Sequence, residues 1–391
     1  MIPFRTALDL LLAAIRAQPV ETVRMEDAHG RVLRHTIYAD RDFPPFDRVM
    51  MDGYALRAAG LDVDRRFRIA GSAPAGRPQA VLPEEPSACL EVMTGAPLPV
   101  GADGIVPVEE TTRTGDTIRV SDAFDAVPDR FIHRAGSDAM KGATLLEPGC
   151  LLDSRGIGVA ASCGAAMLEV SRLPRIAVIP TGDELVAVDE VPAPYQIRQS
   201  NGHAIRAALA REGYPADLMR PLGDEAGADE LRESLETNDW LILTGAISKG
   251  ARDFLPGLLA ELGCDRVFHG VAQRPGKPAG FWLGSRGQAI MALPGNPVSA
   301  LAGLHAFVLP ALAAASGLPR SAPRLVAPAD PIHALPDMTL HLPVSLDKTS
   351  RAHAAPAANS GDFIGLLGSD GFITVPPRGE IQTAYPFTPW R

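Results

Sequence analysis

The chain has 391 residues, a length that predicts two to four domains rather than a single core. Apolar residues make up 46% of the chain and aromatic residues 5%, so we expect a globular protein packed mainly with aliphatic side chains. The net charge of −9, without any block of Lys or Arg, argues against a nucleic-acid partner.

The chain begins with an apolar segment that is typical of an amphipathic helix. Asp9 interrupts the segment and Arg16 follows at helical spacing, and the sequence has neither a basic start nor a small-residue cleavage site. We therefore predict a first helix and not a signal peptide. No apolar run in the sequence approaches the length of a membrane span, so no membrane partner is expected. The cysteines, none in a CxxC pair, favour free thiols in a reduced, cytoplasmic setting: Cys89, Cys150, Cys163 and Cys264.

Residues 42–137 differ from the rest of the chain in being rich in Gly, Pro and short strand-like runs. The runs FRIAG, ACLEVM, GIVPVEE and DTIRV predict a small β-rich domain. The flanking segments 21–41 and 138–171 are predicted to pair into a connecting module, in which GATLLEPGCLLD has the pattern of strand, turn and strand.

Residues 172–320 alternate strands with helices, and we group them with the first helix in residues 1–20. The alternation predicts a doubly wound parallel α/β domain, whose ligands bind beyond the carboxyl ends of the strands. The segments TGDE, TGAISKG and PGNP each follow a predicted strand and are expected at that edge. Residues 321–391 are rich in Pro and Ala with short strands, and they predict a barrel-like C-terminal β domain.

Four short segments combine Gly or Pro with acidic or small polar residues. They are PPFDRVMMDGYA (44–55), MTGAPLP (93–99), PTGDEL (180–185) and LPGNPVSA (293–300). A tight backbone beside carboxylates suits a site for phosphates and a divalent cation. We therefore predict one site assembled from distant parts of the chain.

Two loops at the predicted sheet edge carry candidate acids. Asp183 and Glu184 directly follow a strand, where an acid can hold a metal or tune a base, or can simply cap the next turn. In TGAISKGARDF (244–254), glycines allow close backbone approach, and Ser248 and Asp253 offer polar groups. This loop lacks the P-loop pattern and could also be a plain connection between a strand and a helix.

The segment LPGNPVSA predicts an anion site. Asn296 is placed as the N-cap of a helix, Pro297 suits its first turn, and Ser299 lies near the free amides. Upstream, Arg274 and Lys277 lie in QRPGKP, where they favour oxyanion binding over a solvated charged turn. The sequence has no HExxH motif and no nucleophile elbow. It therefore favours metal-assisted chemistry on an anionic, phosphate-bearing ligand over covalent catalysis.

The four segments together, in this order, closely resemble the molybdopterin molybdenumtransferase family, which includes the bacterial MoeA proteins and the E domain of gephyrin. The resemblance covers essentially the whole chain. It implies a four-domain homodimer whose α/β domain is of the molybdopterin-binding type. It also implies Mg²⁺-dependent insertion of molybdenum from molybdate into adenylylated molybdopterin, with release of AMP. Further partners that it suggests are the molybdopterin adenylyltransferase and the enzymes that accept the cofactor.

The resemblance assigns roles to individual residues. Asp52 and Thr94 would face the pterin cleft across the dimer, with Asp138 among the substrate-binding residues. The acids that would bind Mg²⁺ and support cleavage of the phosphoanhydride are Glu184, Asp224 and Asp253. The residues that would cradle phosphate or pterin are Ser248 and the nearby Gly250, and further substrate-binding residues are Gly182, Gly295 and Asn296. The residues that would form the molybdate site are Arg274, Lys277, Ser299, Arg351 and Ser360.

The chain departs from the family pattern within its motifs. Arg48-Val49-Met50 replaces NSA, Ala246 and Lys249 alter GGVSxG, Gln199 replaces the acid of DSN, and Arg274 replaces a lysine. A non-catalytic pterin-binding or scaffold protein of the same fold is therefore a second interpretation, which the retained acids disfavour. A single-domain molybdopterin adenylyltransferase would resemble only residues 172–320, and the remaining domains argue against it.

Overall fold

The computed structural model forms two compact units. The first unit comprises residues 1–35, 148–153 and 167–391, and the second comprises 36–147 and 154–166. The structure describes residues 1–125, 127–223, 227–245, 247, 254–355, 359–378 and 383–390. The division into four domains stays a prediction, and each unit is described by itself below.

A six-stranded sheet forms the centre of the first unit. Its strands are, in spatial order, β17 (Asp217–Leu218), β14 (Ile176–Pro180), β18 (Trp240–Thr244), β22 (Ala289–Leu293), β21 (Gly280–Leu283) and β19 (Asp265–His269). The first four are parallel, and Pro180, Thr244 and Leu293 lie side by side at their carboxyl ends. The predicted α/β fold class is therefore confirmed.

One strand, β21, corrects the expectation of a wholly parallel sheet. β21 runs antiparallel to both β22 and β19. The reason lies in the connection, because Gly284 donates its amide to the Gln288 carbonyl across a tight turn. Such a turn can join only antiparallel strands, whereas parallel neighbours need a long crossover.

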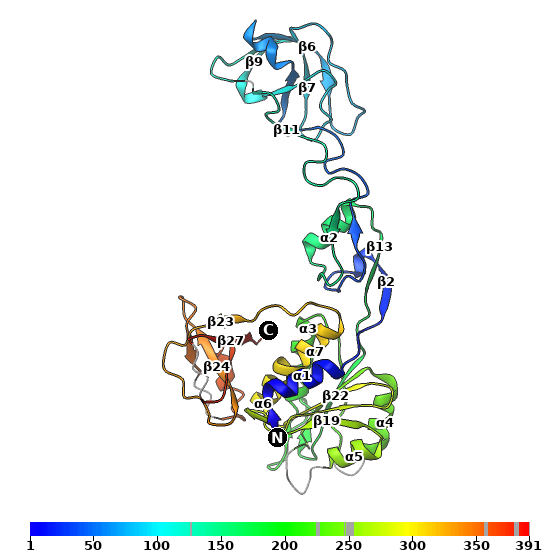
Figure 1. Ribbon diagram of the computed structural model, residues 1–391, viewed down its shortest axis with the longest axis vertical. Helices are drawn as coiled ribbons and strands as arrows, with labels where there is room; N and C mark the ends of the chain where they lie inside the picture. The colour runs from blue at the N-terminus through cyan, green and yellow to red at the C-terminus, as the bar shows by residue number, and fades with distance from the viewer. Residues whose placement is uncertain are drawn as a thin grey trace. The chain divides into compact units, whose positions relative to one another are not determined.

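Helices cover both faces of this sheet (Figure 1). On β14, Ile176 and Val178 belong to one hydrophobic cluster, and Ala177 and Ile179 belong to the other. Since side chains alternate along a strand, the two clusters lie on opposite faces of the sheet. The first face is covered by α1 (Phe4–Ala14), α3 (Asn201–Arg211), α6 (Pro297–Gly303) and α7 (Leu309–Ala315). The second face is covered by α4 (Gly227–Thr237) and α5 (Leu255–Glu261).

The helix after β22 corrects a second expectation. α6, the π-helical segment Leu304–Val308 and α7 run on as Pro297–Ala315, 19 residues with a mean hydropathy of 1.8. Among the described residues this is one helix long and apolar enough to cross a membrane, so the expectation that no apolar run approaches that length was wrong. However, 72% of its apolar window is buried inside the protein, as in the core helix of a globular protein.

A second sheet in the first unit connects the α/β part to the C-terminal segment. It runs β1 (Ile2–Pro3), β20 (Val271–Arg274), β24 (Thr339–Leu346), β26 (Gly371–Val375), β27 (Tyr385–Pro389) and β23 (Arg324–Val326), with β25 (Ala352–Ala354) beside β24. In this sheet Arg274 of β20 pairs with Leu340 of β24. The predicted oxyanion turn therefore begins at the seam between the two sheets.

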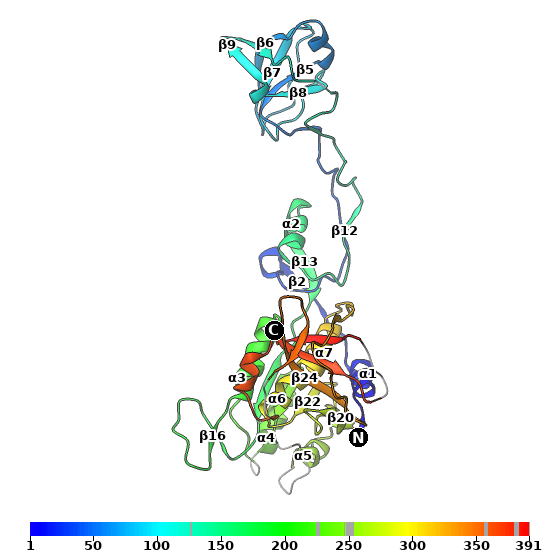
Figure 2. The ribbon, with the colours of Figure 1, turned by 90° about the vertical axis from the view of Figure 1, so that its left-hand side faces the viewer.

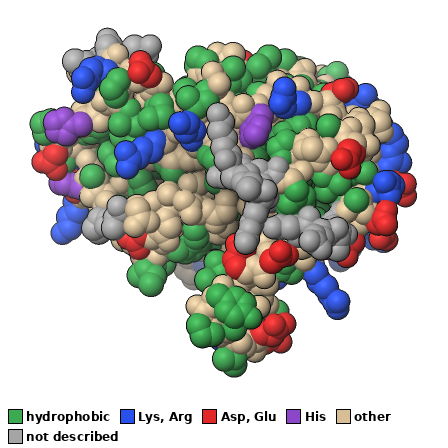
Figure 3. Space-filling model, turned by 90° about the horizontal axis from the view of Figure 1, so that it is seen from below, with side chains coloured by type: hydrophobic (Ala, Val, Ile, Leu, Met, Phe, Trp, Pro, Cys, Tyr) green, Lys and Arg blue, Asp and Glu red, His purple; other side chains and the backbone are tan. Residues whose placement is uncertain are grey.

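Short pairs complete the first unit. β2 (Val20–Arg24) is antiparallel to β13 (Met167–Ser171), and β15 (Leu185–Val186) is parallel to β16 (Ile197–Arg198). Figure 2 shows the segment that carries β16 extending away from the central sheet. On the face drawn in Figure 3, acidic and basic side chains are interspersed with hydrophobic ones.

The second unit is built on a six-stranded sheet. Its order is β8 (Gly104–Pro107), β5 (Gly53–Leu56), β7 (Ala88–Val92), β6 (Arg66–Ala73), β10 (Thr117–Val120) and β9 (Thr111–Thr114). The smaller elements are β3 (Ile37–Tyr38), β4 (Arg48–Val49), β11 (Ile132–His133), β12 (Thr144–Leu146) and α2 (Ser154–Ser162). Gly53 pairs with Pro107 so closely that a Cβ would lie 2.0 Å from the Val106 carbonyl oxygen. The glycine of MDGYA is therefore required by the sheet.

Candidate functional site

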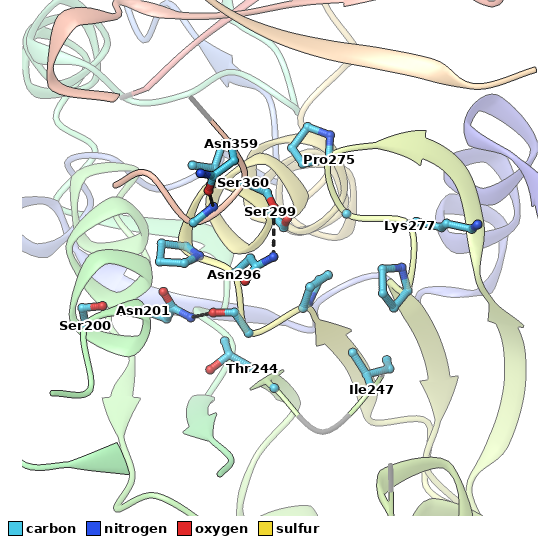
Figure 4. A pocket seen from close by; sticks show the side chains of 18 of the residues that line it. Ser200, Asn201, Thr244, Ile247, Pro275, Lys277, Asn296, Ser299, Asn359 and Ser360 are labelled. Atoms are coloured by element: carbon cyan, nitrogen blue, oxygen red, sulfur yellow. Dashed lines mark hydrogen bonds between the residues drawn. The ribbon is translucent and has the colours of Figure 1, made fainter. Parts of the chain in front are cut away.

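A cavity of about 1180 Å³ lies in the first unit. One wall is formed by the loops at the carboxyl edge of the central sheet, and the other by β24 and the segment around Ser360 (Figure 4). Eight of the predicted site residues line it: Gly182, Glu184, Arg274, Lys277, Gly295, Asn296, Ser299 and Ser360. The structure thus brings together segments that are far apart in the chain.

The floor of the cavity is held by backbone contacts between neighbouring loops. The amide of Thr181 donates to the Thr244 carbonyl at 2.8 Å, and that of Gly245 to the Leu293 carbonyl at 3.0 Å. Gly245 has φ +98°, and a Cβ there would lie 2.5 Å from the Thr181 carbonyl oxygen. A larger residue cannot occupy this position, so the glycine of TGAISKG is explained by close approach.

The start of α6 differs from the predicted cap. Asn296 occupies the N-cap position, but its side chain makes no capping hydrogen bond. Its Nδ2 instead donates to Ser360 Oγ at 2.9 Å, and the Val298 amide donates to the Ser360 carbonyl at 3.1 Å. The C-terminal segment therefore occupies part of the helix N-terminus. Ser299, only 3% exposed, lines the cavity beside it.

The segment Gln199-Ser200-Asn201 was named above as a departure from the family motif and not as part of the site, but all three residues line the cavity. Asn201 Nδ2 donates to the Gly295 carbonyl at 2.6 Å, so the start of α3 braces the loop before α6 (Figure 4). This position could have been found from the retained asparagine of the DSN-like segment. Its contact with the Gly295 carbonyl could not have been predicted, because the two residues are 94 positions apart in the sequence.

Arg274 and Lys277 lie on a turn that is supported from the C-terminal sheet. Gln273, 1% exposed, donates its Nε2 to the Gly276 carbonyl at 3.1 Å. Its Oε1 lies 3.3 Å from Nε2 of His341, which is also 1% exposed. Burial lowers the pKa of His341 to about 4, because the charged imidazolium is poorly solvated there. His341 belongs to no sequence motif and was not among the predicted site residues.

The predicted Mg²⁺ ligands are only partly described. Glu184 is exposed, and its carboxylate lies over Gly182, where a Cβ would meet Oε2 at 2.6 Å. Asp224 and Asp253, and with them Ser248 and Gly250, lie outside the described residues. Within the described part of the chain, no three His, Cys, Asp or Glu side chains form a metal-binding group. Glu184 offers the hard oxygen ligand that Mg²⁺ prefers, and fits as one member of such a set.

Asp52, Thr94 and Asp138 lie in the second unit. Asp52 Oδ1 accepts from the Thr94 amide at 2.7 Å and from the Thr94 hydroxyl at 2.8 Å. These hydrogen bonds lower the pKa of Asp52 below its ordinary value. Asp138 Oδ1 lies 2.8 Å from His133 Nε2, and Arg48 approaches the other ring nitrogen at 3.0 Å. Arg48, a departure from the family pattern, thus contacts a neighbour of Asp138.

Arg351 does not line the cavity. Its guanidinium donates to the carbonyls of Pro328 and Ala329, each at 3.1 Å, within the C-terminal sheet. In the described conformation these bonds hold the side chain to local backbone. Its assignment to the molybdate site stays a prediction.

Comparisons with known proteins point to one family. One family model, described as the MoeA N-terminal region (domain I and II), matches residues 2–164, and another, described as a probable molybdopterin binding domain, matches residues 177–314. A molybdopterin molybdenumtransferase of Synechocystis is 35% identical over 100% of both chains. Molybdopterin molybdenumtransferase 2 of Mycobacterium tuberculosis is 35% identical over 76% of each.

A solved structure supports the same relationship. The molybdopterin biosynthesis moeA protein from Pyrococcus horikoshii OT3 matches with a TM-score of 0.80 and 26% identity, over 99% of this chain and 98% of that one. Two family models and a relative that matches over its full length therefore point to one family. The chain belongs to the molybdopterin molybdenumtransferase family, whose members are transferase enzymes of molybdenum cofactor biosynthesis.

Proposed function

We propose that this enzyme inserts molybdenum from molybdate into adenylylated molybdopterin and releases AMP in a Mg²⁺-dependent reaction. The observation that carries the proposal is one cavity lined both by the acid Glu184 and by the cations Arg274 and Lys277. Its volume of about 1180 Å³ is above the usual range for small-ligand sites, as a nucleotide-bearing pterin requires.

The turn with Arg274 and Lys277 is the proposed oxyanion site. A guanidinium can contact two oxygens of one anion, and an ammonium adds a mobile point charge. Ser299 lines the same cavity and offers a hydroxyl. Because the whole chain carries a net charge of −9, local cations such as these are needed to attract a dianion like molybdate.

Glu184 is the proposed centre of the Mg²⁺-dependent step, with Asp224 and Asp253 as its predicted partners. When bound, Mg²⁺ would offset the negative charge of the adenylyl phosphates. The chain's own contribution is to hold the carboxylate of Glu184 over Gly182 at the cavity wall. The glycine matters because a side chain there would displace the carboxylate.

The remaining elements of the proposal concern assembly. We infer a homodimer in the cytoplasm, in which Asp52 and Thr94 complete the pterin cleft of the partner subunit. Their mutual hydrogen bonds support this role, since they keep Asp52 charged and fixed in direction. The adenylyltransferase would deliver the substrate, and cofactor-dependent enzymes would accept the product.

The proposal is tested by a turnover assay with adenylylated molybdopterin, Mg²⁺ and molybdate. We expect Glu184→Gln and Asp253→Ala to keep the fold and to lower AMP release about 10²–10³-fold, as removal of a charge-stabilising group typically does. Glu190→Gln, an exposed acid in the same loop region, is the matched control and should react like the wild type. Wild-type rates in both acid variants would remove these acids from the mechanism. Pterin binding without AMP release by the wild type would favour the scaffold interpretation.

A further inference from the structure

We propose that His341 is a positioning residue for the oxyanion turn. In this inference a donor chain runs from Thr374 through His341 and Gln273 to the Gly276 carbonyl, and it sets the backbone that presents Arg274 and Lys277. The inference rests on the proposed function in one respect, since it takes this turn to bind an oxyanion.

The three side chains of this donor chain come from adjacent strands. Thr374 on β26 is the register partner of His341 on β24, and its Oγ1 lies 3.2 Å from His341 Nδ1. β24 pairs in turn with β20, which carries Gln273. His341 Nε2 reaches Gln273 Oε1 at 3.3 Å, and Gln273 Nε2 reaches the Gly276 carbonyl at 3.1 Å.

The chemistry of the partners fixes the direction of every hydrogen bond. The Gly276 carbonyl can only accept, so the Gln273 nitrogen faces it and the Gln273 oxygen faces His341. An amide oxygen also only accepts, so His341 carries its hydrogen on Nε2. In the neutral ring Nδ1 is then an acceptor, and the Thr374 hydroxyl donates to it. All three bonds therefore point toward the turn.

The imidazole is held in one orientation by aromatic contacts. Phe4 lies 4.8 Å away at an interplanar angle of 80°, and Phe372 lies 5.2 Å away at 81°. Both are edge-to-face arrangements, which fix the ring plane. Because His341 is almost fully buried, water does not compete for its nitrogens. A ring held this firmly can hold Gln273 in turn.

Gln273, the last side chain of the donor chain, contacts the oxyanion turn itself. Gly276 has φ +92°, and a Cβ there would lie 2.7 Å from Gln273 Nε2, so the amide packs directly on the turn. The Gly276 carbonyl also accepts from the Ala279 amide at 3.1 Å, and the Lys277 carbonyl accepts from the Val271 amide at 2.9 Å. The turn is thus held by backbone on one side and by Gln273 on the other.

The inference is tested by titrating molybdate or tungstate alone into the full-length protein by calorimetry. We expect His341→Phe, which keeps a ring but loses both nitrogens, to weaken oxyanion binding about tenfold, equivalent to about 1.4 kcal/mol. His341→Gln keeps an N–H donor and should recover affinity to within about threefold of the wild type. Phe387→Leu loosens the packing of the same C-terminal sheet away from His341, and serves as the control with wild-type affinity.

A spectroscopic measurement separates positioning from packing. In ¹⁵N-labelled protein we expect His341 to give the signature of the neutral ring protonated on Nε2, and Gln273→Leu to remove that preference. If His341→Phe fails to fold, Thr374→Val carries the same test, with an expected loss of about threefold. If the wild type binds oxyanion and both His341→Phe and Thr374→Val bind equally well, the inference is wrong. If the wild type binds no oxyanion at the turn, the proposed molybdate site fails first.

Discussion

His341 gives the sharpest prediction of how pH affects stability. The side chain is 1% exposed, and its hydrogen-bonding and ring neighbours Gln273, Thr374, Phe4 and Phe372 are all uncharged. Burial therefore lowers the pKa to about 4 in the folded protein, against 6.5 for the ordinary histidine. Below pH 6.5 the unfolded chain takes up a proton that the folded chain resists. The free energy of unfolding must then fall as the pH falls.

The size of this effect follows from the pKa difference. The loss of unfolding free energy caused by His341 is absent above the unfolded pKa of 6.5, and it grows as the pH falls to the folded pKa of about 4. Each pKa unit corresponds to about 1.4 kcal/mol, so the full loss is about 3 kcal/mol. A change from about pH 7.5 to about pH 5 covers more than half of the range between the two pKa values, and it lowers the free energy of unfolding by about 2 kcal/mol.

Urea unfolding at these two pH values measures the loss. The wild type and His341→Gln are compared, because the variant retains a hydrogen-bonding side chain but cannot titrate. We expect the wild type to lose about 2 kcal/mol more than the variant on going to the lower pH. His203→Gln, an exposed histidine on α3, is the control and should lose as much as the wild type. An equal loss in the wild type and His341→Gln would refute the reasoning that burial keeps this imidazole neutral.

Three further predictions concern the sites and the assembly. Lys277→Ala should raise the molybdate concentration for half-maximal insertion about tenfold with pterin affinity unchanged, because it removes one cation from the turn. If titrations instead show a collapse of pterin affinity, Lys277 belongs to the pterin phosphate site and not to the molybdate site. Mixing Thr94→Trp with Asp253→Ala protein should restore some AMP release, since one cleft per mixed dimer stays intact; no recovery would contradict the shared cleft. Burial raises the pKa of Cys89 to about 12, so alkylation followed by mass spectrometry should modify it far more slowly than the partly exposed Cys163.

The strands of the central sheet could be predicted because their signal is local. Ile176–Pro180 and Trp240–Thr244 are buried at every position and apolar at all but Thr244, as expected of strands covered on both faces. Glycine and proline then mark where each strand ends, and in a parallel arrangement those ends meet at one edge. This is why Gly182, Glu184 and Gly295 could be expected together before any contact was known.

The contacts that complete the site could not be predicted in the same way. Asn296 and Ser360 are 64 residues apart, and Gln273 and His341 are 68 apart. No periodicity links such pairs, because each depends on how the C-terminal sheet meets the α/β sheet. The antiparallel β21 was missed for a related reason: strand propensity is the same for both directions, and only the turn at Gly284 decides.

The surroundings of Gln199 explain why a glutamine can replace the acid of the family's DSN segment at this position. The Gln199 side chain is 5% exposed, and it packs so closely on Gly202 that a Cβ there would lie 2.3 Å from its Nε2. A carboxylate this deeply buried would need a charged or hydrogen-bonding partner, yet the oxygen of Gln199 has none in the described structure. A neutral amide costs less to bury than an unpaired charge, so glutamine fits this environment better than the acid of the family pattern. The substitution therefore removes a charge from the protein interior, while Glu184 remains exposed at the cavity wall.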